Sequence, residues 1–304
     1  MPLKNGTRLG PSIGGATFNA FDAMRITSDV QRPPQIRFKD LEAMVNVKVR
    51  YNTLPFQVRT DFFRMTGDSV LAALTLQLAN RDLGFHTEDG VHRAVVNVFG
   101  RVFSLTGRVV QTFEDVVRTD VPDSLLAQAA SRHVVYGQAL PLRPGRYRLS
   151  LALKDLGNGN VGTLEQSLVV PAFDEETLSV SSLVLADKLE RVATKDIGRG
   201  QFVIGATKLR PSNDGRFRRE SSLGLYLQIY NLHAPSKVEY EVSQNGQVLF
   251  RKIEPPLREA SAQLTLERSL PLETLTPGRY TVRFRITDTT TKKTLVPEAS
   301  FTVE

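Results

Sequence analysis

Apolar and polar residues alternate with a period of two over long stretches of this sequence. In residues 147–153 the odd positions hold Tyr or Leu, and Arg148 and Ser150 lie between them. In residues 280–286 the even positions hold Tyr, Val, Phe and Ile, and the odd positions hold Thr or Arg. This pattern predicts strands with one face in a core and one in water, as in an antiparallel sheet. Further strands are predicted at 43–51, 95–103, 108–114, 238–242, 248–253 and 263–268.

The strands belong to an internal repeat. Residues 140–170 and 270–303 both contain LPL, then Pro-Gly-Arg-Tyr, an alternating strand, a polar turn and a second alternating strand. Upstream, LTLQLAN at 74–80 matches LYLQIYN at 225–231. The first copy carries extra residues between these two landmarks, and the segments 83–91 and 122–133 are the places that can hold them. Two copies of one strand-rich unit are the simplest explanation.

Turn and helix signals are fewer. The pair Asn158-Gly159 predicts a two-residue hairpin turn between two strands. Residues 122–128 can open one short helix, with Asp123 or Ser124 as its cap. Residues 181–192 are ambiguous, and the repeat favours a strand that opens the second unit.

Many short strands at intervals of about 8–12 residues are typical of sandwiches rather than α/β folds. A chain of 304 residues is long for one domain, and its length fits two domains of ordinary size. We therefore predict an all-β protein with two tandem immunoglobulin- or fibronectin-like antiparallel β-sandwich domains, at 34–172 and 173–304. Because the chain has no Trp, the immunoglobulin likeness is one of layout only. Residues 1–33 are rich in Gly, Pro and Ser and lack alternation, which predicts an extended N-terminal arm.

Composition narrows the possible chemistry. The absence of Cys excludes disulfides, thiolate metal sites and a cysteine nucleophile. The net charge of +7 raises the question of nucleic acid, but basic and acidic residues are dispersed along the chain, so that partner is not expected. The sequence contains no apolar run long enough to span a bilayer and no signal peptide at its start.

Two polar loops have residue types that can bind metals. His86, Glu88, Asp89 and His92 lie within HTEDGVH, but no further ligand is evident and a polar loop between strands is favoured. The sequence DLGNGN at 155–160 resembles part of a calcium loop without its bidentate Glu, so a plain hairpin is favoured there. We assign no catalytic, cofactor-binding or metal-binding residues and expect no cofactor.

The candidate contact residues are mainly arginines. Arg216, Phe217, Arg218 and Arg219 form the densest basic cluster, which either touches a phosphate or a base or simply begins a strand after an exposed loop. The outward positions of the strand near the C-terminus add Arg279, Arg283 and Arg285.

Several stretches resemble the C-terminal region of bacterial GWxTD-domain proteins of the acidobacterial type. They are PPQIRFKDLEAMV at 33–45, YNTLPFQVRTDFFRMTGDSV at 51–70, VVNVFGRV at 95–102, LTGRVVQTFED at 105–115 and ALPLRPGRYRL at 139–149. The GWxTD motif itself is absent, because the chain has no Trp. The resemblance implies β-rich modules and an extracytoplasmic setting, and it supplies no activity to transfer.

These features favour a non-catalytic structural or interaction protein, a subunit of an extracytoplasmic assembly in the cell envelope or at the surface. Its partner would be another protein or a second copy, contacted through residues 1–33, and removing that arm should abolish association without unfolding the domains. The alternative is a module that binds a glycan or an anionic polymer through its arginines, with binding that falls steeply with salt. An enzyme is a third hypothesis, and a metal bound at His86 and His92 would support it.

Overall fold

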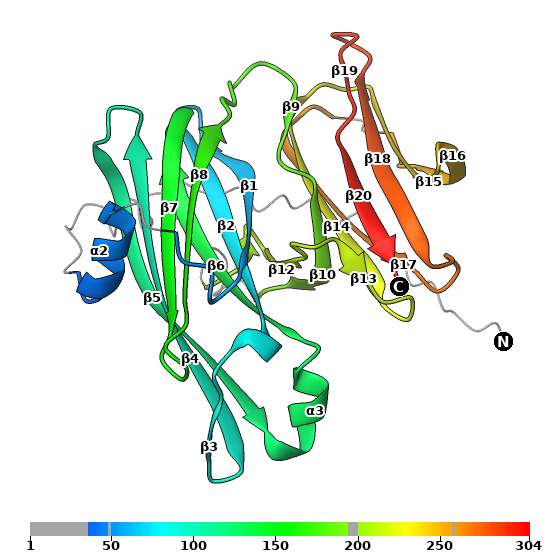
Figure 1. Ribbon diagram of the computed structural model, residues 1–304. Helices are drawn as coiled ribbons and strands as arrows, with labels where there is room; N and C mark the ends of the chain where they lie inside the picture. The colour runs from blue at the N-terminus through cyan, green and yellow to red at the C-terminus, as the bar shows by residue number, and fades with distance from the viewer. Residues whose placement is uncertain (1–35, 48–49, 194–199, 257–258) are drawn as a thin grey trace, which may run out of the picture.

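The computed structural model describes residues 36–47, 50–193, 200–256 and 259–304, and strands dominate it (Figure 1). The predicted arm at 1–33 lies outside the described residues. The all-β prediction is confirmed, with the strands arranged in four sheets. The immunoglobulin- or fibronectin-like detail and the boundary between 172 and 173 stay predictions.

The first repeat consists of two antiparallel sheets. Three strands form one sheet in the order β1 (Gln57–Thr66), β2 (Ser69–Ala79) and β6 (His133–Leu142). The other sheet contains β3 (His86–Glu88), β4 (Val91–Ser104), β5 (Val109–Pro122), β7 (Gly145–Asp155) and β8 (Val161–Val170). Their apolar positions meet between the sheets, where Leu74, Leu76, Val98, Leu149 and Leu151 are all buried. The period-two pattern therefore arises as predicted, because each strand has one face in the core between the sheets.

The second repeat follows the same plan. One sheet has the order β11 (Val203–Ile204), β12 (Thr207–Pro211), β10 (Val184–Arg191), β14 (Ser222–Leu232) and β17 (Ser261–Pro271), and β9 (Ser179–Val180) pairs with β14. The other has β13 (Arg216–Phe217), β20 (Glu298–Val303), β18 (Gly278–Asp288), β15 (Ser236–Gln244) and β16 (Gln247–Ile253), and β19 (Thr294–Leu295) pairs with β18. Strand β14 pairs with β10 and β17 as β2 pairs with β1 and β6, so the copies share their strand pairing.

The Pro-Gly-Arg-Tyr motif forms the same corner in both repeats. The Tyr147 hydroxyl donates to the carbonyl oxygen of Arg143 at 2.9 Å, and the Tyr280 hydroxyl donates to that of Thr276 at 2.6 Å. The preceding Gly145 and Gly278 have φ angles of 153° and 156°, which side-chain-bearing residues rarely adopt. A tyrosine that bonds back to the main chain at such a corner is a known feature of β-sandwiches. The motif thus fixes the entry into β7 and β18.

The two repeats pack face to face through equivalent sheets, so that four sheets are stacked side by side (Figure 1). The joint is apolar: Phe63 and Leu71 of the first repeat pack with Val184, Ala186 and Tyr226 of the second. The rings of Phe63 and Tyr226 meet edge to face, with centroids 5.9 Å apart. The repeats are therefore joined by a buried interface and not only by the connecting chain.

Main-chain hydrogen bonds add to this joint. The amide of Ser182 donates to the Phe62 carbonyl oxygen at 3.0 Å, and the Phe62 amide donates to the Ser182 hydroxyl at 2.9 Å. The Tyr230 hydroxyl accepts from the amide of Arg64 at 2.9 Å. The guanidinium of Arg64 lies over the Tyr230 ring, 4.5 Å from its centroid. These bonds fix the orientation of one repeat relative to the other.

The strand predicted at 43–51 is wrong over its described first part, because α2 (Lys39–Val47) is a helix. Leu41 and Val45 are one helical turn apart and pack onto the outer face of the first repeat, against Phe99, Phe103 and Ala152. Below the helix, Arg101 is 8% exposed and forms a salt bridge with Glu42. The apolar alternation at 45–49 favoured a strand, but the described part of this segment is a helix because it covers an apolar face of the sheet.

The other sequence predictions fare better. Strands occupy the segments predicted at 95–103, 108–114, 238–242, 248–253 and 263–268, and β10 lies within 181–192. The short helix appears as the 3-10 turn η2 (Asp123–Leu125) and α3 (Leu126–Ala129). The two-residue turn at Asn158-Gly159 is wrong, because residues 156–160 all lie between β7 and β8. Asp155 explains the wider loop, since its carboxylate accepts from the amides of Gly157 and Gly84.

Candidate functional site

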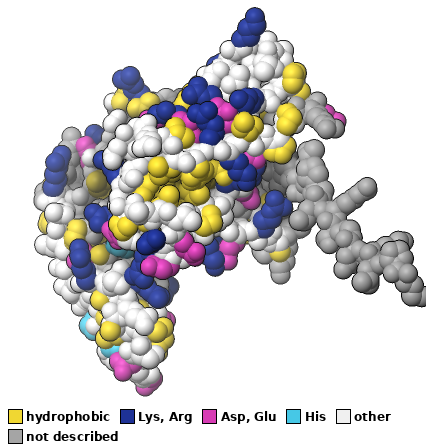
Figure 2. Space-filling model, turned by 90° about the vertical axis from the view of Figure 1, so that its right-hand side faces the viewer, with side chains coloured by type: hydrophobic (Ala, Val, Ile, Leu, Met, Phe, Trp, Pro, Cys, Tyr) yellow, Lys and Arg dark blue, Asp and Glu magenta, His cyan; other side chains and the backbone are white. Residues whose placement is uncertain are grey.

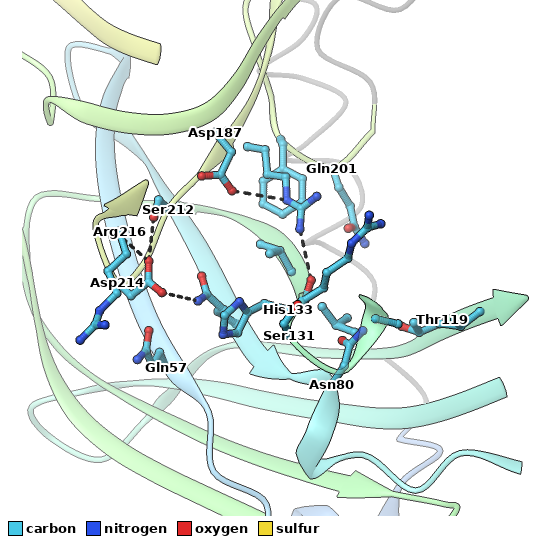
Figure 3. Close-up of a pocket in the computed structure, with 18 of the residues that line it drawn as sticks. Gln57, Asn80, Thr119, Ser131, His133, Asp187, Gln201, Ser212, Asp214 and Arg216 are labelled. Carbon is cyan, nitrogen blue, oxygen red and sulfur yellow. Dashed lines mark hydrogen bonds and ion pairs between the residues drawn. The ribbon is translucent and has the colours of Figure 1, made fainter. Parts of the chain in front are cut away.

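A groove of approximately 1540 Å³ lies between the two repeats (Figure 3). Gln57 and Gln77 of the first repeat face Ser212 and Asp214 of the second across it. We call this feature the inter-repeat groove. Its size exceeds the roughly 300–1000 Å³ that is typical of small-molecule pockets, so an extended ligand suits it better than a compact one.

The first wall of the groove comes from segments that the second repeat lacks. The strands β4 and β5 have 14 residues each, whereas their counterparts β15 and β16 have 9 and 7. The extra length of β5, together with η2, α3 and the turn that follows, places Arg118, Asp120, Leu125 and Arg132 at the groove. Residues 83–91 hold the additional β3–β4 hairpin. Both segments that we expected to hold the extra residues of the first repeat, 83–91 and 122–133, therefore contain structure that the second repeat lacks.

The second wall comes from a segment that the first repeat lacks. Strands β1 and β2 are joined by a tight turn at Gly67 and Asp68, but their counterparts β10 and β14 are separated by residues 192–221. The described part of this insertion contains β11, β12 and β13. It brings Lys208, Arg210 and Arg218 to the groove. Insertions in repeat proteins commonly form the binding face, and here insertions from both copies meet at one place.

The lining of the groove is basic. It contains seven arginine and lysine residues and four acidic residues among the described positions, namely Arg81, Arg118, Arg132, Lys208, Arg210, Arg216 and Arg218 against Asp120, Asp187, Asp214 and Glu304. Several of the cations are paired: Arg216 forms a salt bridge with Glu304 at 2.9 Å. No ion pair of the described residues involves the side chain of Arg118, Arg132, Lys208 or Arg218, all of which are exposed.

The paired groups hold the two walls together. Arg210 lies 4.0 Å from the Asp187 carboxylate and donates to the carbonyl oxygen of His133 at 3.2 Å, which joins the second repeat to the first (Figure 3). Burial raises the pKa of Asp187, and the positive charge of Arg210 partly opposes that shift. The Gln77 amide bonds to the Asp214 carboxylate at 3.5 Å, again between the repeats. Of the four exposed cations, Lys208 lies across the strand pair from Glu190, whose pKa is lowered by Lys188 and, to a smaller degree, by Lys208. The other three, Arg118, Arg132 and Arg218, have no such acidic neighbour among the described interactions.

A smaller apolar slot of approximately 320 Å³ shares a wall with the groove, formed by residues 200–203. Phe63, Leu71, Ile204 and Leu209 contribute to its lining. The ring of Phe202, which lines both the slot and the groove, lies so close to Gly137 that a Cβ atom there would approach within 2.7 Å of it. Glycine at 137 therefore allows the ring to pack against β6.

The cluster predicted at 216–219 does not act as one unit. Phe217 is 4% exposed and packs edge to face on Phe301 in the core, so its ring is not available for stacking on a base. Arg219 donates to the carbonyl oxygen of Glu273 at 3.0 Å. Arg216 and Arg218 do line the groove. The cluster begins strand β13, as one of the two sequence interpretations held.

The three arginines of β18 lie on the outer face of the second repeat, away from the groove. Arg283 lies between Glu298 at 2.8 Å and Glu241 at 3.5 Å, and Arg285 pairs with Glu239 at 3.4 Å. Arg279 is exposed. Lys and Arg side chains are interspersed with Asp and Glu side chains on this side of the molecule (Figure 2). The face therefore offers little uncompensated charge to an anionic polymer.

The polar loop HTEDGVH forms the β3–β4 hairpin. The His92 ring bonds to Asp123 at 2.8 Å and to the Thr87 hydroxyl at 2.9 Å, and the His86 ring bonds to the Gly157 carbonyl oxygen at 3.2 Å. The two imidazoles thus have separate protein partners. In the described part of the chain, no group of three or more His, Asp or Glu side chains is placed to hold a metal ion.

Sequence reasoning missed Arg118, Arg132 and Lys208 as groove residues. The first two lie in or beside a segment that the repeat comparison had already marked as extra. The insertion that carries Lys208 precedes the first landmark of its repeat, so that comparison did not extend to it. No protein-family model and no curated protein sequence matches the chain.

Proposed function

We propose that this chain is a non-catalytic interaction protein that holds a protein partner between its two repeats. The observation that carries the proposal is the origin of the inter-repeat groove, which is lined by insertions that differ between two otherwise equivalent copies. The buried joint at Phe63 and Tyr226 supports the proposal further, because it holds the two walls at a fixed separation.

The proposed setting is extracytoplasmic, in the cell envelope or at the surface. It is supported by the resemblance to the C-terminal region of GWxTD-domain proteins. None of the helices in the described residues is both long and apolar enough to cross a bilayer. Fractionation of cells that express the native gene tests this setting, and recovery of the chain only with cytoplasmic markers would contradict it.

Crosslinking of native preparations followed by mass spectrometry tests the interaction function. We expect reproducible crosslinks from Lys208 to one protein partner. A second sample, treated with the crosslinker after denaturation, controls for chance encounters. Crosslinks confined to this chain would contradict the proposal.

A further inference from the structure

The four cations that lack ion pairs are distributed over both walls of the inter-repeat groove. Arg118 lies on β5 and Arg132 lies just before β6, both in the first repeat. Lys208 lies on β12, and Arg218 follows β13, both in the second repeat. A ligand that spans the groove thus meets positive charge from two sides. Opposed cations repel one another across a gap, so an anion between them removes an unfavourable interaction as well as forming a favourable one.

The lining argues against a uniformly charged polymer. Asp120, Asp187 and Asp214 lie among the cations and would repel a ligand with a negative charge at every unit. Phe202 is the one aromatic residue in the described lining, so the groove lacks the stacking platforms on which single-stranded nucleic acid depends. A chain with acidic groups at intervals fits this mixed lining better.

The other features of the groove suit a peptide. Val134 and Val135 of β6 line the groove, and within the described residues β6 pairs with no strand other than β2. The carbonyl oxygens of His133, Ala139 and Pro141 on β6 already accept side-chain hydrogen bonds. The stretch around Val135 is left, and an extended peptide gains main-chain hydrogen bonds by lying along it. The neighbouring apolar slot belongs to the buried joint, because Phe63 and Leu71 in its lining are each 1% exposed. Successive side chains of a strand point to opposite sides, so carboxylates on the two faces of such a peptide reach the cations of the two walls.

We infer that the inter-repeat groove binds an extended acidic peptide segment of a protein partner, with its carboxylates at Arg118, Arg132, Lys208 and Arg218. This inference rests on the interaction function proposed above and specifies the chemistry of the segment that is bound. Charge-assisted hydrogen bonds between arginine and carboxylate supply both affinity and orientation. Recognition therefore depends on salt concentration and on the spacing of the acidic residues.

Fluorescence anisotropy with the full chain tests the inference. The probe is a short fluorescein-labelled peptide in which pairs of Glu alternate with pairs of Val, and the matched probe has Gln in place of Glu. The double variant Arg118→Glu/Arg132→Glu is compared with Arg108→Glu/Arg146→Glu, which makes the same change of charge at exposed positions of the first repeat, at the end of the β4–β5–β7 sheet opposite to Arg118. We expect the wild type and the Arg108/Arg146 variant to bind the Glu peptide alike. The Arg118/Arg132 variant should bind about tenfold more weakly or worse.

Four binding results would overturn the inference. One is equal binding by the two double variants, the second is equal binding of the Glu and Gln peptides, and the third is no binding of the Glu peptide by the wild type. Preference for a sulfated polysaccharide over the Glu peptide would likewise assign the groove to a glycan. Circular dichroism and thermal melting confirm that each variant is folded. If the wild type crosslinks to a partner and the Arg118/Arg132 variant crosslinks to it equally, the inference about the groove is contradicted, while the proposed interaction function is not.

Discussion

At the scale of single residues, the two repeats use the same side chains for the same purpose. Asp155 and Asp288 end equivalent strands, both are fully buried, and each carboxylate accepts hydrogen bonds from the loop that follows. Each also bonds to the segment that follows one of two equivalent strands, at Gly84 after β2 and at His233 after β14. The sequence pointed to this aspartate only as part of a calcium-like motif, because its partners are distant along the chain.

Replacing Asp288 with Asn should make stability less dependent on pH. Burial raises the pKa of Asp288, but hydrogen bonds from Thr291, His233 and Thr290 outweigh it and lower the pKa from 3.8 to about 2. A carboxyl with a lowered folded-state pKa stabilises the fold above pH 4, and this contribution is lost as the pH falls towards 2. We expect Asp288→Asn to cost roughly 1 to 2 kcal/mol at pH 7 and much less at pH 2. Urea unfolding across this pH range measures the difference, and a constant cost would contradict the prediction.

Removing the Tyr280 hydroxyl should weaken the corner of the second repeat. The Tyr280 side chain is 1% exposed and its hydroxyl donates to the Thr276 carbonyl oxygen, so Tyr280→Phe removes a part-buried hydrogen bond. We expect a loss of about 1 to 2 kcal/mol in the free energy of unfolding. Tyr147→Phe is the matched control, because Tyr147 makes the same bond where the ring is only partly buried. An equal or larger loss for Tyr147→Phe would contradict the role of burial.

At the scale of elements, alternation predicted most strands because each of them has one face in a core. The same signal failed at 43–51, where α2 buries Leu41 and Val45 but leaves Val47 66% exposed. The helix covers Phe99 and Phe103, which lie on the outer face of the sheet. That these two side chains need a cover is evident only once the pairing of the strands is known. The insertion at 192–221 escaped notice for a related reason, since the unequal spacing of β1–β2 and β10–β14 is visible only once the strands are paired.

Truncating Leu41 should release α2 from its sheet. The side chain is fully buried against the outer face of the first repeat, so Leu41→Ala leaves a cavity beside Phe99. We expect a loss of about 3 kcal/mol and faster amide hydrogen exchange throughout residues 39–47. The exposed Val47 provides the control, because Val47→Ala should change neither quantity. Unchanged exchange in Leu41→Ala would show that the helix is held by its ion pairs instead.

At the scale of the whole molecule, the buried joint predicts that the two repeats unfold together. Phe63 is 1% exposed in that joint, and Phe63→Ala removes its contact with Tyr226. We expect one transition in guanidinium for the wild type and two for Phe63→Ala, because the repeats keep their own cores when they separate. Leu149→Ala, in the core of the first repeat, is the control and should lower stability without splitting the transition. A single transition for Phe63→Ala would contradict this independence.

The joint at Phe63 and Tyr226 also determines how the groove exchanges its occupant. The joint fixes the described parts of the two walls relative to each other, so for the proposed peptide we expect capture without a closing motion. The same rigidity prevents the walls from enclosing what they hold, so the occupant keeps one side in water and leaves without waiting for a gate to open. Such a groove suits reversible binding, in which the fraction of occupied protein follows the local concentration of the partner.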